Sequence, residues 1–247
     1  MYGNGDQELV PQYWWDSYYQ ARPIAYEERL IGFKDVFDRF LSRGGICFEV
    51  GFYPGNYLIY LGKKFGYVVE GIDRTCFDEL KVKAHFEKHG VKVGKLIRGD
   101  FLSWRPNRTY DVVLSMGFIE HFINWREVLR KHVFLVKPGG KLIITIPNMR
   151  GFQHFLYWFL DRDKLNMHHL EVMDPTLIKK ELELLRMKVI LSSYYRTFDF
   201  YGEPKDRLRQ WIVRKLLRLA EVVNARIRFP TKLFSPNIVV VSEKPQT

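Results

Sequence analysis

Cysteine is scarce in this chain: Cys47 and Cys76 are its only two among 247 residues. Their positions show neither the pairing of a disulfide framework nor the spacing of a metal-ligand motif. A chain of this length can bury well over half of its unfolded surface, so its fold needs no disulfide or metal scaffold. We expect both thiols to be reduced, as is typical of a cytoplasmic protein.

Long apolar runs are also missing. No stretch approaches the roughly 18 apolar residues that span a bilayer, and residues 1–7 lack the basic-then-apolar order of a secretory signal. Internal repeats and low-complexity linkers are absent, while hydrophobic residues at 47% and charged residues at 27% are ordinary for a globular protein. We therefore predict a single cytoplasmic domain over residues 1–247.

Acidic residues are outnumbered: 28 Asp and Glu stand against 39 Lys and Arg, a formal net charge of +11. Such a charge favours anionic partners, which leaves nucleic acid, phospholipid headgroups and an anionic substrate open. Residues 200–232 are predicted to hold a basic amphipathic helix that begins near Lys205. Its apolar side consists of Leu208, Trp211, Ile212, Leu216, Leu219 and Val223. This helix either packs on its own domain or makes a peripheral contact with an anionic membrane.

What the chain does contain is an alternation of strands and helices. Apolar runs typical of strands occupy residues 46–50, 67–71, 91–97, 110–115, 141–146, 187–194 and 237–242. Helical spacing occupies residues 23–41, 56–65, 77–89, 124–136 and 152–159, and a further helix begins at Asp174-Pro175. This pattern predicts an α/β fold with a parallel sheet covered on both faces.

The turn after the first predicted strand runs Glu49-Val-Gly-Phe-Tyr-Pro-Gly55 into a helix. Gly51 and Gly55 let the backbone approach a ligand at the carboxyl edge of the sheet. Asp73 follows at the end of the second strand, where a carboxylate can accept hydrogen bonds from ribose hydroxyls. These features favour a nucleotide-type ligand, although a tight strand-to-helix turn alone would use the same glycines.

Ordered motifs between residues 45 and 147 resemble those of class I S-adenosylmethionine-dependent methyltransferases of the small-molecule type. The resemblance implies S-adenosylmethionine as the cofactor, bound by Glu49, Gly51, Gly55, Asp73, Asp100, Phe101, Ser115 and Met116. Within this set Asp73 corresponds to the ribose acid, and Asp100-Phe101 to the pair beside the adenine. Residues 116–121 resemble the Glu-His element of many small-molecule members, and residues 137–141 resemble the turn before the fifth strand.

The same resemblance implies a Rossmann-like, doubly wound, mostly parallel seven-stranded sheet with an antiparallel last strand beside the sixth. It also implies a cofactor-binding core at residues 23–147 and an acceptor-pocket region at residues 148–185. One departure lies in the turn, because Tyr53 replaces the family's middle glycine. A bulky side chain then stands where the backbone usually passes closest to the cofactor, which leaves open whether cofactor binding is weakened.

Residues 1–22 form a predicted aromatic arm that ends at Arg22-Pro23. Its aromatic residues show no clear period: Tyr13, Trp14, Trp15, Tyr18 and Tyr19. The arm either forms a lid over cofactor and substrate, with Arg22 meeting a carboxylate, or covers the sheet or a dimer face. The oligomeric state stays open.

Three histidines are candidates for the general base that a hydroxyl acceptor needs: His121, His168 and His169. His121 follows the fourth strand at the cofactor edge, whereas His154, His168 and His169 lie in the predicted acceptor-pocket region. A structural hydrogen bond is the alternative for His121, and a solvated loop is the alternative for the adjacent pair. We predict no metal site, because no carboxylate stands at a familiar ligand spacing from these histidines.

The favoured function is methyl transfer, at oxygen, to a small-molecule or lipid- or sugar-linked acceptor. Families that methylate the amino groups of bases usually carry an Asn/Asp/Ser-Pro-Pro-aromatic segment where this chain has Ser115-Met-Gly-Phe118. An RNA-directed methyltransferase remains an alternative because of the positive charge and should bind with steep salt dependence. A non-catalytic protein that retains the fold is the other alternative.

Overall fold

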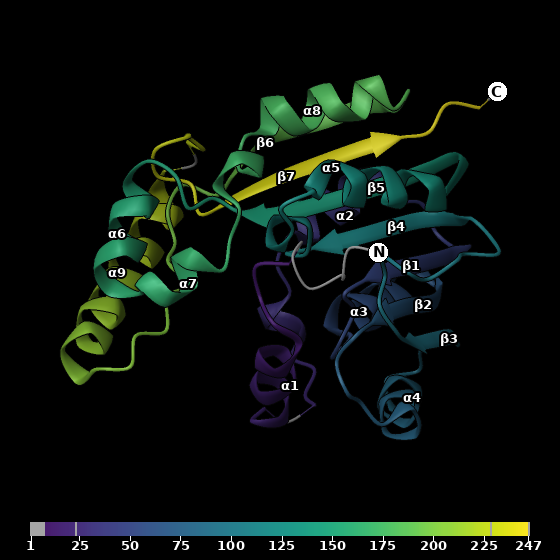
Figure 1. The fold of residues 1–247 in the computed structure, drawn as a ribbon, viewed down its shortest axis with the longest axis horizontal. Helices are drawn as coiled ribbons and strands as arrows, with labels where there is room; N and C mark the ends of the chain where they lie inside the picture. Colours follow the sequence, from purple (N-terminus) through teal and green to yellow (C-terminus); the bar gives the residue numbers. More distant parts are fainter. Residues whose placement is uncertain (1–7, 23, 228, 247) are drawn as a thin grey trace, which may run out of the picture.

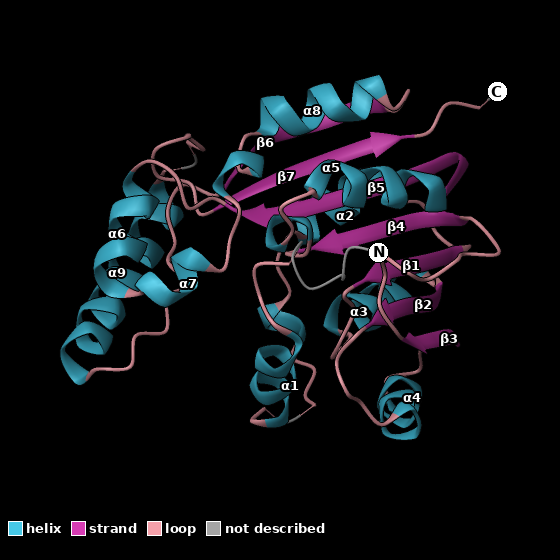
Figure 2. Cartoon of the chain, viewed as in Figure 1, coloured by secondary structure: helices cyan, strands magenta, loops and turns pink. Residues whose placement is uncertain are grey.

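A seven-stranded mixed sheet forms the centre of the computed structural model, which describes residues 8–22, 24–227 and 229–246 (Figure 1 and Figure 2). Its strands are β1 (Ile46–Val50), β2 (Val68–Asp73), β3 (Val93–Arg98), β4 (Tyr110–Met116), β5 (Val136–Pro147), β6 (Lys188–Tyr195) and β7 (Asn237–Glu243). They lie in the order β3-β2-β1-β4-β5-β7-β6, and β7 runs antiparallel to both of its neighbours. The predicted Rossmann-like sheet with an antiparallel last strand is thereby confirmed.

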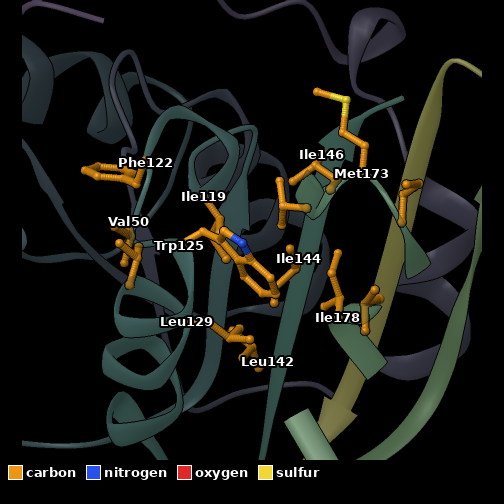
Figure 3. Packing of buried hydrophobic residues seen from close by; sticks show 14 of the residues in the cluster. Val50, Ile119, Phe122, Trp125, Leu129, Leu142, Ile144, Ile146, Met173 and Ile178 are labelled. Carbon is orange, nitrogen blue, oxygen red and sulfur yellow. The ribbon is translucent and has the colours of Figure 1, made fainter. Parts of the chain in front are cut away.

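Side chains of the central strands point alternately into two hydrophobic cores, one on each face of the sheet. In β5, Leu142 and Ile144 belong to one core and Ile143 belongs to the other. Figure 3 shows the first core, where Trp125 lies close to Ile144. The covering helices are α5 (Trp125–Leu135) and α8 (Pro175–Leu184) on this face, and α2 (Lys34–Phe40), α3 (Asn56–Phe65) and α4 (Glu79–Lys88) on the other. Burial on both faces explains the nearly continuous apolar runs of these strands.

A second group of helices stands beyond the carboxyl end of β5, where Figure 1 shows them beside one another. The group comprises α6 (Phe152–Leu160), α7 (Arg162–Asn166) and α9 (Arg207–Arg226). Gln153 of α6 connects this helix to the segments that flank α9. Its Nε2 donates to the carbonyl oxygens of Asp199, which precedes α9, and Phe234, which follows it. No described helix is both long and apolar enough to cross a membrane.

The N-terminal part of the chain differs from its prediction in two places. Residues 12–20 form a regular helix, α1 (Gln12–Gln20), in which no side chain is fully buried. The single helix predicted for residues 23–41 is replaced by a short 3-10 helix, η2 (Glu28–Leu30), followed by α2. Phe33 separates the two with a left-handed φ of 60°, which a continuous α-helix cannot contain. Residues 1–7 of the predicted arm, and Pro23, lie outside the described residues.

Candidate functional site

A cavity of about 760 Å³ opens at the carboxyl ends of β1, β2 and β4, the edge at which ligands bind in open α/β sheets. Its lining comprises Glu8, Val10, Gln12, Trp15, Tyr19, Gly51, Ile72, Asp73, Arg74, Thr75, Gly99, Asp100, Phe101, Met116, Gly117, Phe118, His121 and Phe122. Six predicted site residues therefore face this cavity, which we call the cofactor cavity after the role predicted for them: Gly51, Asp73, Asp100, Phe101, Met116 and His121. The other five lie outside its lining: Glu49, Gly55, Ser115, His168 and His169.

The turn from β1 into α3 is tight because of its glycines. Gly51 has a φ of 73° and donates its N–H to the carbonyl oxygen of Ile72 at 2.8 Å, which fixes the turn against the end of β2. Gly55 has a φ of 100°, and a Cβ at this position would stand 2.3 Å from the ring of Phe86. Glycine is therefore needed at both positions. Gly55 shapes the turn without facing the cofactor cavity.

Two of the predicted cofactor residues are buried beneath the site. Glu49 is 2% exposed and Ser115 is fully buried. The Glu49 Oε2 and the Ser115 Oγ have no hydrogen-bond partner among the described residues. Burial, and secondarily the nearby charge of Asp73, raises the pKa of the Glu49 carboxyl well above its usual value. Because unpartnered buried polar atoms cost free energy, both atoms suit a ligand group or water that reaches them.

Asp73 is held at the cavity wall by two backbone donors. Its Oδ2 accepts from the N–H of Tyr53 at 2.9 Å, and its Oδ1 accepts from the N–H of Thr75 at 2.7 Å. Burial raises the pKa of the Asp73 carboxyl, and these two hydrogen bonds oppose the rise because they favour its charged form. The carboxylate is therefore oriented before any ligand arrives.

The ring of Tyr53 lies outside the cofactor cavity. It stacks on Phe77, with ring centroids 5.5 Å apart and an interplanar angle of 13°, and meets the edge of Tyr19 at 5.1 Å. The bulky residue that replaces the middle glycine is thus accommodated by aromatic packing on the outer side of the turn. The Tyr53 side chain is not part of the cavity lining.

Asp100 and Phe101 form another part of the wall. The Asp100 carboxylate accepts from the backbone N–H groups of Leu102 and Ser103, at 2.9 and 3.1 Å. Phe101 is 4% exposed and packs edge to face against Phe118, with ring centroids 5.8 Å apart. An oriented acid thus stands beside an apolar aromatic surface, as a ligand with a polar edge and a flat ring requires.

The N-terminal arm forms the wall opposite the sheet. The N–H of Leu9 donates to the carbonyl oxygen of His121 at 2.8 Å, and the ring of Trp15 packs edge to face against His121 at 5.1 Å. Arg74 anchors the arm by an ion pair with Glu8 at 2.5 Å and a hydrogen bond to the Gln12 Oε1 at 2.7 Å. Arg74 was not predicted as a site residue, and its place directly after Asp73 is the signal that could have revealed it.

A compact cluster of Glu120, His121 and His168 adjoins the cofactor cavity. One potential ligand atom from each residue lies within 4.8 Å of the others, and the two imidazole rings have centroids 4.7 Å apart. Glu120 and His121 belong to the 3-10 helix η3 (Ile119–His121), whereas His168 follows α7. The sequence predicted no metal site, because the fold alone brings the distant His168 to the Glu-His pair.

Burial governs the protonation of this cluster. It lowers the pKa of His121 to about 4 and that of His168 to about 3, and it raises the pKa of Glu120 to about 8. Both imidazoles are therefore uncharged at neutral pH and make weak general bases.

The other two histidines of the predicted acceptor region take different places. His169 donates its backbone N–H to the carbonyl oxygen of Glu120 at 2.7 Å. Its Nδ1 is buried without a hydrogen-bond partner among the described residues. His154 is exposed on α6. The structure therefore brings His168 and His169 to Glu120 and leaves His154 apart from them.

A second cavity, of about 730 Å³, adjoins the first and shares Met116 and Gly117 with it. Its lining comprises Leu30, Gly32, Phe33, Tyr57, Met116, Gly117, Thr145, Ile146, Pro147, Tyr195, Arg196, Tyr201 and Asn237. None of these lining residues belongs to residues 148–185, the predicted acceptor-pocket region. The polar side chains that meet here come from distant parts of the chain and could not be grouped from the sequence.

Comparisons with known proteins agree with this architecture. A family model described as a methyltransferase domain matches residues 25–185. Over 148 residues the chain is 23% identical to the ubiquinone biosynthesis O-methyltransferase of Coxiella burnetii. The matched region covers 60% of this chain and 62% of that protein. The chain thus spans less than two thirds of the length of the curated relatives it matches.

Solved structures share the fold at low sequence identity. A SAM dependent methyltransferase from Archaeoglobus fulgidus has a TM-score of 0.52 at 20% identity, over 85% of this chain and 92% of that chain. The phosphoethanolamine N-methyltransferase 2 of Haemonchus contortus, in complex with S-adenosyl-L-methionine, has a TM-score of 0.59 at 13% identity, over 86% of this chain and 52% of that chain. At these identities the likeness concerns the fold alone.

Proposed function

Because this chain belongs to the S-adenosylmethionine-dependent class I methyltransferases, we propose that it methylates an oxygen of a small or lipid- or sugar-linked acceptor held in the second cavity. The observation that carries this proposal is the contact between the two cavities at Met116 and Gly117. An acceptor in one cavity can therefore face a methyl group presented from the other.

The first cavity fits S-adenosylmethionine by its chemistry. Asp73 offers a carboxylate to the ribose hydroxyls, and Ile72 and Phe101 offer apolar surface to the adenine beside the acid of Asp100. The unpartnered oxygen of Glu49 suits the amino group of the methionine portion. When bound, the cofactor supplies a methyl group on a positively charged sulfur.

The residues of this chain contribute positioning and exclusion of water. Methyl transfer is an in-line displacement, so most of the rate gain comes from holding the acceptor atom behind the methyl group. Trp15 and Tyr19 of the arm cover the cofactor cavity, which supports the interpretation of the arm as a lid. At the boundary, Gly117 adopts a φ of 70° and carries no side chain that would separate the cavities.

The second cavity suits an acceptor that combines an apolar body with polar or anionic groups. Leu30, Phe33 and Ile146 supply apolar surface, while Arg196 brings a guanidinium. Arg196 is ion-paired with Asp199, with 3.0 Å between Nη1 and Oδ2, which fixes its orientation. Further polar groups come from Tyr57, Tyr195, Tyr201 and Asn237. The name of the Coxiella burnetii relative, an O-methyltransferase, supports oxygen as the methylated atom.

A peripheral contact with an anionic membrane from the cytoplasmic side is part of this proposal. On α9 the buried side chains are Val213 and Ala220, whereas Leu208, Trp211 and Leu219 are more than half exposed. The helix carries several cations, namely Arg207, Arg209, Arg214, Lys215, Arg218 and Arg226. The neighbouring helix α6 exposes Phe155, Trp158 and Phe159. Exposed aromatic rings beside cations suit the interface of an anionic bilayer.

Transfer of a labelled methyl group tests the proposal. The purified chain is incubated with methyl-labelled S-adenosylmethionine and an extract of the source organism, with and without nuclease. The expected result is a nuclease-resistant product of low molecular mass or extractable into organic solvent, whose label resides in a methoxy group. Label that disappears with nuclease would instead establish the RNA-directed alternative and overturn the proposal, as would label on nitrogen or carbon.

A further inference from the structure

We propose that Glu120, His121 and His168 form a site for one divalent transition-metal ion, with Zn²⁺ as its best match, at the boundary of the cofactor and second cavities. Two imidazole nitrogens and one carboxylate oxygen are a donor set that such ions prefer, and Mg²⁺ favours oxygen ligands instead. The three ligand atoms already lie within 4.8 Å of one another. Zinc bonds of about 2.0–2.2 Å place tetrahedral ligands about 3.4 Å apart, so side-chain adjustments of about one ångström complete the site.

Backbone contacts fix both histidines in the form that binds a metal. The Nδ1 of His121 lies 2.9 Å from the carbonyl oxygen of Met167, and the Nδ1 of His168 lies 2.7 Å from that of Lys164. A carbonyl oxygen only accepts, so each Nδ1 carries the hydrogen and each Nε2 carries the lone pair. Ligand histidines in metal sites are commonly oriented by such a bond from the second ring nitrogen.

Glu120 supplies the third ligand and is otherwise unexplained. It is 1% exposed, and its Oε2 has no hydrogen-bond partner among the described residues. An unpartnered carboxyl oxygen at this depth costs free energy, and coordination to a cation would remove that cost. The backbone of the same residue is held in place, because its carbonyl oxygen accepts from the N–H of His169.

The cluster adjoins the cofactor cavity and lies next to a residue that lines both cavities. His121 lines the cofactor cavity. A Cβ added to Gly117, a residue that lines both cavities, would stand 3.5 Å from the Glu120 Oε1. Three protein ligands leave coordination positions open, as is typical of catalytic rather than structural zinc sites.

An open position at this boundary gives the site a role in transfer, and this part of the inference rests on the proposed function. A hydroxyl of the acceptor that meets the ion has a lowered pKa and releases its proton to solvent. The oxygen then uses an electron pair to form the bond to the methyl carbon. The electron pair of the broken bond between sulfur and carbon stays on sulfur, which becomes a neutral thioether.

Metal binding is measured without cofactor or acceptor, so its outcome is independent of the transfer assay. The untagged chain is stripped with a chelator, dialysed against Zn²⁺ or Mg²⁺ alone, and analysed for bound metal. We expect about one Zn²⁺ per chain and no retained Mg²⁺. Glu120→Gln and His168→Gln should each lose the Zn²⁺. His154→Gln, which removes an exposed histidine, should keep it.

Two further measurements distinguish the loss of a metal ligand from misfolding of a variant. His168 does not line the cofactor cavity, so His168→Gln should retain affinity for S-adenosylmethionine while losing Zn²⁺. X-ray absorption of the Zn²⁺-loaded wild-type chain should show scattering from two imidazoles and oxygen. A wild-type chain that takes up no Zn²⁺, variants that bind it unchanged, or an absorption spectrum without imidazole would overturn the proposal.

Discussion

The backbone N–H of Tyr53 donates a hydrogen bond to the Asp73 Oδ2, with 2.9 Å between nitrogen and oxygen. The residue that replaces the family's middle glycine thus helps to orient the carboxylate that we propose as the ribose partner. Its ring packs on Tyr19 and Phe77, outside the cavity. Since the contact uses a backbone amide, a bulky side chain in this turn is compatible with cofactor binding.

Trp15 tests the interpretation of the N-terminal arm as a lid. It lines the cofactor cavity and packs against His121, so Trp15→Ala removes apolar surface from the cofactor's cover. We expect the dissociation constant for S-adenosylmethionine to rise about tenfold, measured by calorimetry. Tyr13→Ala is the matched control, because Tyr13 belongs to the same helix and is 73% exposed. Equal affinities for the two variants would show that the arm does not cover the ligand.

The arm also illustrates what the sequence could predict. The aromatic composition of residues 12–20 indicated a docked segment but not a helix, because their side chains show no buried stripe even in the folded chain. The strands, in contrast, followed directly from their apolar runs, and the five inner strands β2, β1, β4, β5 and β7 are buried on both faces by the two cores. Local pattern therefore predicted the sheet and missed an element whose conformation depends on contacts with Arg74 and His121.

Substitution of Arg196 tests the proposal that the second cavity holds the acceptor. Arg196→Met removes its guanidinium from that cavity and leaves the cofactor cavity intact. For an acceptor with an anionic or polar group we expect the KM to rise about tenfold with little change in kcat, the signature of lost ground-state binding. The exposed Arg39→Met serves as the control. A raised dissociation constant for S-adenosylmethionine with an unchanged acceptor KM would show that Arg196 contributes to cofactor binding and not to acceptor binding.

His132 predicts a measurable pH dependence of stability. Its side chain is fully buried beside Phe101, and burial lowers its pKa from 6.5 to about 4. The unfolded chain therefore binds a proton at this residue below pH 6.5 while the folded chain resists protonation down to about pH 4. Acidification through this window should lower the free energy of unfolding by up to about 3 kcal/mol.

A comparison of variants isolates this effect. His132→Phe removes the titrating group, so its denaturant unfolding should lose less stability than the wild type does over the same pH window. The exposed His154→Phe should follow the wild-type profile. Parallel pH profiles for His132→Phe and the wild type would show that His132 is protonated equally in the folded and unfolded chains.

Co-sedimentation with vesicles tests the proposed membrane contact. Vesicles that contain anionic phospholipid should bind the chain, and neutral vesicles or high salt should release it. Trp158→Ala combined with Trp211→Ala should lower the partition coefficient about tenfold, because both rings are half exposed on α6 and α9. Leu80→Ala, at an exposed position on α4, should leave binding unchanged. Equal partition of all three chains would contradict the contact.

The candidate site, like the fold, could be predicted from the sequence only in part. Asp73 ends β2 and Asp100 follows β3, two strands that the sequence predicted, and six predicted site residues face the cofactor cavity. The second cavity combines residues from β5, β7 and the segments around Phe33 and Arg196, which only the folded topology brings together. His168 likewise reaches Glu120 through the fold, so the sequence alone could not suggest a metal-binding cluster.

Titration calorimetry with S-adenosylmethionine tests the cofactor assignment most directly. We expect the wild-type chain to bind the cofactor at a single site. Asp73→Ala should bind about tenfold more weakly or worse, a loss of about 1.4 kcal/mol, because the ribose loses its carboxylate partner. Asp38→Ala, at an exposed position paired with Lys64, should bind as the wild type does. A folded wild-type chain that gives no binding heat at millimolar cofactor, or an Asp73→Ala variant with unchanged affinity, would contradict the assignment.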